Sequence, residues 1–360
     1  MFLRNFLLAL LSAHDIAHNN PTDERRGLHE IYQAALKEDG QVVVWAGGDE
    51  SHYMDFVKEA FEARFPGITL NITVDLSKYL DGRLDVELKK DRTAIGVDSI
   101  ILQSVHDFPR WSEDGLLRRY APNGFSNIYP ALRDKKATWY GLWVSSWTGA
   151  WNKEKLLDVD PPKEWEDWLR PEFKNRLVLT YPNDDDAVLF AYHLILEQYG
   201  TAWLDRLLEQ NPRWVRGAQT PRTLVRNESS PYAAYFAASG GWTKEHPIIF
   251  SRPKQGKYVT WPQTAAILRD APHPQGAMLL HNFILTYEFQ LNMTRWPVRR
   301  DVPSPSGLPY LWLENSTDPT EFGRFMDDRA LVERVRFYIE SRIGPPQGEN
   351  PRFDSFLSAS

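Results

Sequence analysis

The chain has 360 residues, of which 42% are hydrophobic and 13% are aromatic. This composition excludes a disordered chain, and the length is more than one hydrophobic core usually organises, so we expect two lobes. The net charge of -6 provides no basic field for nucleic-acid phosphates or an anionic membrane. The lack of Cys excludes a thiol nucleophile, a disulfide and a Cys-based metal site.

The N-terminus has features of an export signal. Arg4 precedes an apolar run over residues 6–11, and the small residues Ser12 and Ala13 follow, without an Ala-x-Ala cleavage pattern. We therefore predict a signal peptide over 1–20 and a secreted or periplasmic location. Asn-x-Ser/Thr sequons, which suit a secreted glycoprotein, begin at Asn71, Asn227, Asn292 and Asn315.

The first part of the chain alternates strand and helix patterns. An amphipathic piece over 28–36 precedes a buried-type strand over 42–45, a helix over 53–65 and an alternating strand over 68–74. A helix over 77–90, a strand over 98–102 and a helical stretch ending near 113–117 follow. Such β-α-β order predicts a parallel sheet with crossover helices.

The stretch WYGLWVSSWTGAWN, residues 139–152, is rich in strand-forming residues and apolar on both faces. A strand buried on both faces would have to find partners for the central hydroxyls of Ser145 and Ser146. One interpretation is a crossing strand that passes between two lobes and presents these hydroxyls to a cleft. The alternative is a central sheet strand whose serines bond to the backbone.

A second α/β set follows the crossing strand. This set begins with residues 165–169, and the pattern then predicts a strand over 177–180, a helix over 185–199 and helical structure over 203–210. Residues 229–241 are rich in Ser, Ala, Gly and Tyr, and 247–256 are rich in turn residues. The last predicted elements, separated by a Pro/Ser/Gly loop over 301–309, are a strand over 258–268, a helix over 274–285 and a charged helix over 320–343.

Five segments in this order resemble one protein family: WAGGDESHYMDFVKEAFEARFPGI, DSIILQSVHDFPRWSEDGLL, WYGLWVSSWTGAWNKEKL, RLVLTYPNDDDAVLFAYHLILEQYG and VTWPQTAAILRDAPHPQGAMLLHNFILTYEFQ with WPVRRDV after it. The family is the type 2 periplasmic substrate-binding proteins of ABC importers, which includes ferric-ion, thiamine and organophosphate binders. The resemblance implies an α/β fold of two lobes joined by two hinge strands, with a ligand cleft between them. We place lobe one at 40–142 plus 261–300, lobe two at 144–258 and a C-terminal helical segment at 301–360.

The expected ligand site lies where strands lead into helix N-termini at the carboxyl edges of the sheets. These places are residues 47–51, 103–104, 145–148, 183–186 and 260–264. The predicted ligand-binding residues are Trp45, Gly48, Asp49, Glu50, Gln103, Ser145, Ser146, Trp147, Asp184, Asp185, Tyr232 and Trp261.

The most informative polar cluster is Asp184-Asp185-Asp186. A helix start accounts for one or two of these residues, as a cap and as charges that complement the helix dipole. With Asp49 and Glu50 from the first turn, carboxylates would converge on a cationic or amine-bearing ligand, and Trp45, Trp147 and Trp261 would offer ring faces, although each Trp alone is more often a core residue. Asp184 and Asp185 are expected to carry the charge recognition.

We therefore predict a solute-binding protein, without catalysis, for a small polar organic ligand. Ferric-ion binding is one alternative, since Tyr and Asp oxygens suit a hard cation, but Tyr232 and Tyr235 do not form the neighbouring tyrosine pair of the ferric-ion binders. An enzyme on the same scaffold, using Ser145 or one of the three aspartates, is the other. Neither a Gly-x-Gly-x-x-Gly fingerprint nor a phosphate-binding loop occurs, so no cofactor or metal is predicted. The expected partners are a small molecule and a membrane transporter, with no nucleic acid, and we expect a monomer.

Overall fold

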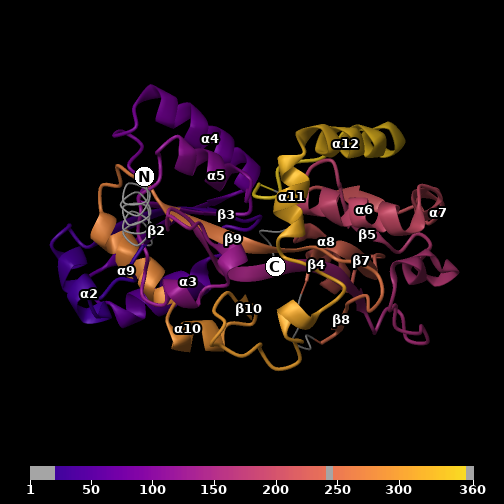
Figure 1. Cartoon of the computed structure of the whole chain (residues 1–360). Coiled ribbons are helices and arrows are strands. Elements are labelled where there is room, and N and C mark those ends of the chain that lie inside the picture. The colour runs from indigo at the N-terminus through magenta and orange to yellow at the C-terminus, as the bar shows by residue number, and fades with distance from the viewer. Residues whose placement is uncertain (1–20, 241–245, 354–360) are drawn as a thin grey trace, which may run out of the picture.

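The computed structural model describes residues 21–240 and 246–353; the predicted signal peptide lies outside these ranges. Figure 1 shows two lobes of helices and strands with β4 and β9 running between them. The architecture is mixed α/β with two lobes, as the sequence predicts. Within the described residues, no helix is long and apolar enough to cross a membrane.

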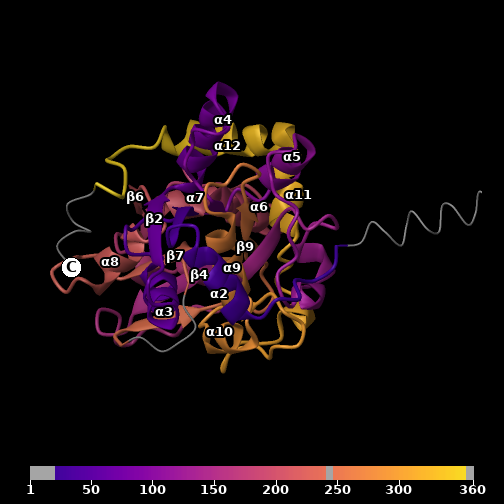
Figure 2. The ribbon, with the colours of Figure 1, turned by 90° about the vertical axis from the view of Figure 1, so that its left-hand side faces the viewer.

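Lobe one is built on the predicted β-α-β pattern. Strand β1 pairs in parallel with β2 on one side and with β3 on the other, and β9 continues the sheet antiparallel to β3. Helix α2 packs against α9, as Figures 1 and 2 both show. The elements are α2 (Leu28–Leu36), β1 (Gln41–Gly47), α3 (Asp55–Arg64), β2 (Thr69–Asp75), α4 (Ser77–Lys90), β3 (Ser99–Leu102), α5 (Asp107–Glu113), α9 (Pro274–Ile284), α10 (Tyr287–Asn292) and β10 (Trp296–Pro297).

Strand β4, Tyr140–Asn152, connects the lobes. Its first half pairs antiparallel with β9 (Thr260–Ile267) and β10, whereas its second half, from Trp147 onward, pairs with β7 and β8 of lobe two. All but two of its residues are buried, in keeping with apolar residues on both faces. The crossing-strand interpretation is thereby confirmed.

Lobe two contains β4's second half and the short parallel pair of β5 and β6. A bridge between Leu177 and Ala234 brings β5 beside β7. Helix α6 is buried along most of its length and starts at Asp186 with the side chain of Asp185 as its cap. The elements are β5 (Val178–Thr180), α6 (Asp186–Tyr199), α7 (Ala202–Glu209), β6 (Arg213–Val215), α8 (Thr220–Arg226), β7 (Ala234–Ser239) and β8 (Ile248–Ser251), with 3-10 turns at Trp165–Leu169 and Pro171–Phe173. Outside lobe two, 3-10 turns lie at Phe125–Asn127, Pro130–Leu132 and Leu311–Leu313.

The charged C-terminal pattern forms two helices rather than one. Helix α11 (Glu321–Asp327) ends at Asp328, whose carboxylate accepts a hydrogen bond from the Leu331 N–H (2.9 Å) and starts α12 (Arg329–Ile343). A side chain that caps a new helix explains the break in one periodic pattern. Both helices pack against α6, and α11 also contacts β9 (Figure 1). The C-terminal segment therefore covers both the inter-lobe strand and lobe two.

The four Asn-x-Ser/Thr sequons all place their Asn at the surface. Asn71, Asn227, Asn292 and Asn315 are exposed. Their glycosylation stays a prediction.

Candidate functional site

A cavity of about 370 Å³ lies between the two lobes. It is lined by the first turn of lobe one, the middle of β4, the start of α6, the loop before α8, the segment just before β10 and residues of β9 and α11. Ten of the twelve predicted ligand-binding residues line it: Gly48, Asp49, Glu50, Gln103, Ser145, Ser146, Trp147, Asp184, Asp185 and Trp261. These ten residues come from both lobes, so the predicted places meet at one cavity.

Close backbone packing shapes the first turn. A Cβ on Gly47 would lie 1.9 Å from the Oγ of Ser77, so only glycine allows β1 to approach the start of α4 this closely. The Ser77 Oγ in turn accepts a hydrogen bond from the Gln103 N–H (2.9 Å). The two loops that follow β1 and β3 are therefore held together at the cavity wall.

Asp49 reaches from lobe one to lobe two. Its carboxylate accepts hydrogen bonds from the backbone N–H groups of Ala218 (2.5 Å) and Gln219 (3.1 Å) in the loop before α8. Burial raises the pKa of Asp49, and the two N–H groups oppose that rise. The carboxylate therefore lines the cavity and also connects the two lobes.

Asp184 makes a second contact between the lobes. Together with its partners Lys78 and Arg216 it forms a cluster that we call the inter-lobe latch. Asp184 is only 7% exposed and accepts hydrogen bonds from the Nζ of Lys78 (2.6 Å) and the Nε of Arg216 (2.9 Å). Burial acts to raise its pKa, but these two partners outweigh it and the pKa of Asp184 is lowered. Because two cations of the protein already neutralise this carboxylate, its expected role as the charge that binds the ligand needs revision.

The other two aspartates of the cluster differ from Asp184. Asp185 accepts a hydrogen bond from the Val188 N–H (2.9 Å) and caps α6, as the simple helix-start interpretation requires. Burial, with repulsion from Asp49 and Asp186, raises the pKa of Asp185 to about 7. Asp186 pairs with Arg336 of α12 at 2.8 Å. Of the three, only Asp185 lines the cavity without an ion pair to Lys or Arg among the described residues.

Glu50 is the remaining carboxylate of the wall. It lies 3.1 Å from the Nε2 of His52, which is exposed. Burial raises the pKa of Glu50, and the nearby charge of Asp49 adds to the rise. Carboxylates that repel one another in a partly desolvated cavity are stabilised by a bound cation.

The part of the cavity wall formed by β4 and β9 carries aromatic rings and polar atoms without partners. The rings of Trp147 and Trp261 meet edge to face at 4.7 Å, and Phe322 of α11 lies 6.3 Å from Trp261. Within the described residues, the Ser145 Oγ and the Trp147 Nε1 are buried without a hydrogen-bond partner. Such atoms are costly unless a ligand or a water supplies the partner.

Two predicted residues, Trp45 and Tyr232, do not line the cavity. Trp45 is buried on the helix-covered face of β1, with the guanidinium of Arg83 over its ring at 4.3 Å. Tyr232 stacks under Arg213 at 5.5 Å, and Tyr235 is buried and donates its hydroxyl hydrogen to the Ser239 carbonyl (2.8 Å). Trp45 lies within β1 before the carboxyl end at Gly47, and both faces of the strand belong to the core there, so its ring cannot point into the cavity.

Several cavity residues escaped the sequence analysis. They lie outside the places that the sequence marked as the expected ligand site: Ser77, Lys78, Gln219, Arg222, Ser239, Arg295 and Phe322. The segment WPVRRDV is part of the family resemblance, but nothing in it singled out Arg295, which precedes it directly.

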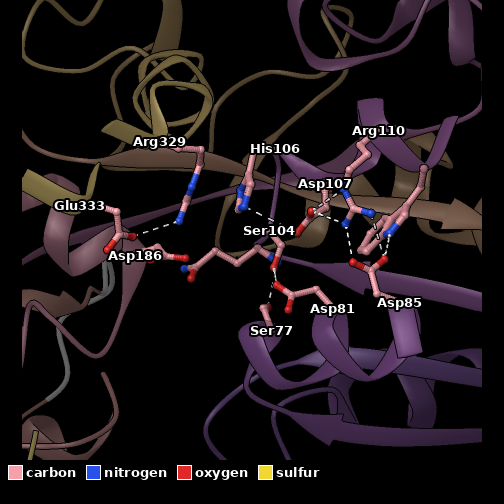
Figure 3. Close-up of polar contacts among 12 residues, drawn as sticks. Ser77, Asp81, Asp85, Ser104, His106, Asp107, Arg110, Asp186, Arg329 and Glu333 are labelled. Carbon is pink, nitrogen blue, oxygen red and sulfur yellow. Dashed lines mark hydrogen bonds and ion pairs between the residues drawn. The ribbon is translucent and has the colours of Figure 1, made fainter. Parts of the chain in front are cut away.

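A polar network borders the cavity on the side of α4 and α5. The Ser104 Oγ donates to Asp81 (2.6 Å), and Arg110 bridges Asp85 and Asp107, as Figure 3 shows. Burial raises the pKa of Asp81 to about 6. These contacts are internal to lobe one, so they fix the position of Ser104 at the wall.

The fold is shared with solved binding proteins of low sequence identity. Iron-bound HitA from Pseudomonas aeruginosa is 17% identical, with a TM-score of 0.62 over 82% of this chain and 99% of that one. AfuA from Actinobacillus pleuropneumoniae, with fructose-6-phosphate bound, is 15% identical, with a TM-score of 0.63 over 84% and 98%. The substrate-binding protein of an ABC transporter from Agrobacterium tumefaciens is 13% identical, with a TM-score of 0.71 over 84% and 93%. At these identities the likeness concerns the fold.

A search of curated protein sequences finds no significant match to this chain. The model of one protein family, described as bacterial extracellular solute-binding protein, matches residues 96–305, which is more than half of the chain. The match includes β4, β9 and the whole of lobe two, and the fold neighbours are binding proteins of the same type. This chain therefore belongs to the bacterial extracellular solute-binding proteins.

Proposed function

We propose that this solute-binding protein captures a small, polar, amine-bearing organic molecule between its lobes and releases it unchanged to a membrane transporter. The observation that carries the proposal is the set of three cavity carboxylates, Asp49, Glu50 and Asp185. None of them forms an ion pair with Lys or Arg among the described residues, and burial raises the pKa of each. An ammonium group placed among them would relieve their mutual repulsion.

The cavity size and its rings support an organic ligand. A volume of about 370 Å³ suits a small molecule rather than a peptide or a second protein. Trp147 and Trp261 offer faces to an ammonium group or its carbon chain, and hydroxyl and amide groups at Gln103, Ser146 and Gln263 offer hydrogen bonds. We further propose that the lobes close on the ligand about β4 and β9.

Ferric ion is the alternative ligand, because iron-bound HitA shares this fold. The tyrosines that would supply iron ligands, Tyr232 and Tyr235, are not among the cavity-lining residues. In the described ranges, no three His, Asp or Glu side chains are grouped as a metal site would need. The donor set at the cavity therefore favours an ammonium group over a hard metal ion.

Thermal unfolding with a panel of small amines and with ferric citrate tests the proposal. A ligand of the native state raises the melting temperature in proportion to its concentration above Kd. We expect at least one amine to do so, and chromatography afterwards to recover it chemically unchanged. Conversion of the amine would identify an enzyme, and a response to ferric citrate alone would identify an iron carrier.

A further inference from the structure

Arg295 lines the cavity next to the middle of β4. It directly precedes β10, in which Trp296 lies opposite Val144 of β4 in an antiparallel pair. Continuing that register by one residue places Arg295 across from Ser145. Both residues line the cavity, so one guanidinium and one hydroxyl meet at the same part of the wall.

Aromatic rings hold the guanidinium of Arg295 without using its hydrogen-bond donors. Its central carbon lies 4.9 Å from the ring centre of Phe56, 5.6 Å from that of Tyr53 and 5.7 Å from that of Trp143. Stacking on ring faces fixes a guanidinium in place while its five N–H groups stay available at the edge.

The other cavity cations are already engaged. Lys78 belongs to the inter-lobe latch, and Arg222 stacks on Phe250 and has a further contact. Arg295, by contrast, forms neither a hydrogen bond nor an ion pair within residues 21–240 and 246–353. A positioned, half-buried guanidinium fork that lacks an acceptor is the geometry that binds a carboxylate or phosphoryl group through two parallel hydrogen bonds.

Ser145 supplies a second donor for the same group. Its Oγ is buried and, in the described part of the chain, has no hydrogen-bond partner. A hydroxyl can donate to an anion that the neighbouring guanidinium holds. An acceptor-rich ligand group would satisfy the fork and the hydroxyl at once, whereas an ammonium group, which only donates, could not satisfy the fork.

We propose that Arg295 and Ser145 form an anion subsite in the cavity, and that the ligand is dipolar, with a carboxylate or a phosphoryl group there in addition to its amine. The amine half of this inference rests on the proposed function, but the anion half does not. Asp49, Glu50 and Asp185 are left to hold the ammonium group, since none of them pairs with Arg295.

Isothermal titration with four probes of similar size tests the subsite. The probes are 4-aminobutyrate, 3-aminopropyl phosphate, butylamine and butyrate, each titrated into the wild-type chain, Arg295→Gln and Arg64→Gln. Arg64 is the matched control, because its guanidinium also stacks on a phenyl ring, that of Phe65 at 5.6 Å, but lies outside the cavity. The two dipolar probes differ in their acid, so their relative affinities show whether the subsite prefers carboxylate or phosphoryl.

We expect Arg295→Gln to weaken binding of the better dipolar probe about tenfold to a hundredfold, as loss of a charge-assisted pair does, and to leave butylamine binding unchanged. Arg64→Gln should bind all probes as the wild type does. Equal affinity of Arg295→Gln for the anionic probes overturns the subsite, as does the failure of every anionic probe to bind the wild type at millimolar concentration. Binding of butylamine alone would leave the proposed function standing without the subsite. If butyrate binds in a way that depends on Arg295 and no amine binds, the subsite stands and the proposed amine ligand is wrong.

Discussion

Asp184→Asn is expected to weaken ligand binding about tenfold to a hundredfold, although the Asp184 carboxylate is already neutralised by Lys78 and Arg216. The reason is that the inter-lobe latch joins α4 of lobe one to two loops of lobe two, the one before α6 and the one before α8. A hydrogen bond to a charged group contributes about 1.5 to 3 kcal/mol, and if the lobes close as proposed, that free energy favours their closed arrangement. The apparent affinity is proportional to the fraction of molecules that are closed, so a variant that closes less often binds the ligand more weakly.

Calorimetry on a double-mutant cycle separates this latch from direct contact with the ligand. Asp184→Asn and Lys78→Met should each weaken binding, and the double variant should be little worse than either, because both remove the same interaction. Asp205→Asn is the matched control: its carboxylate pairs with Arg342 of α12, and both residues lie outside the cavity. If the effects of Asp184→Asn and Lys78→Met add, the two residues act on the ligand independently and the latch is wrong.

Acid is expected to destabilise the fold through His281, which is fully buried in α9. The His281 Nδ1 lies 2.7 Å from the Tyr140 hydroxyl, and the Nε2 lies 2.7 Å from the Ser99 Oγ, which donates to the Ala266 carbonyl. The serine therefore accepts from Nε2–H and the tyrosine donates to Nδ1, an arrangement that requires neutral imidazole. Burial lowers the pKa of His281 to about 3.

Because the pKa of His281 is lower in the folded state than the usual 6.5 of an unfolded chain, its contribution to stability is complete above pH 6.5. That contribution is lost as the pH falls from 6.5 to about 3, at about 1.4 kcal/mol for each pH unit. Asp185, whose folded pKa is raised to about 7, acts in the opposite direction over part of this range.

Urea unfolding of wild type and His281→Asn at pH 7.5, 6 and 5 isolates the histidine, since every other group titrates equally in both proteins. The free energy of unfolding should fall more steeply with acid in the wild type, so that the two curves approach each other toward pH 5. Parallel curves would mean that His281 is protonated in the folded chain without penalty.

Sequence patterns predicted the parts of this fold that depend on local periodicity. The β-α-β order from β1 to β2 and the length of β4 followed from apolar runs and turn residues, and both are confirmed. The strand β7 was missed because its alanines have low strand propensity, yet all six of its residues are buried between β4 and β5, where small side chains fit. Residue type alone gave no strand signal there.

The site was predictable up to the point where partners far apart in sequence decide a residue's role. Asp184 was correctly placed at the cavity, but Lys78 lies 106 residues before it and Arg216 lies 32 residues after it, so their pairing could not be read from the chain. Arg295 was missed because its significance comes from the rings of Phe56 and Trp143, which belong to α3 and β4. Local motifs carry no information about such convergence.

The central claim is that the cavity beside Trp147 binds a small organic molecule. Native mass spectrometry of the purified chain, of Trp147→Ala and of Trp312→Ala tests it most directly. Trp312 is the matched control, because it is also half-buried with an unpartnered Nε1 among the described residues, but it lies outside the cavity. With the ligand found by the amine panel added in excess, wild type and Trp312→Ala should carry one extra mass equal to that of the ligand, and Trp147→Ala should lose it. Equal retention by all three proteins, or loss from Trp312→Ala alone, would contradict the assignment of the ligand to this cavity.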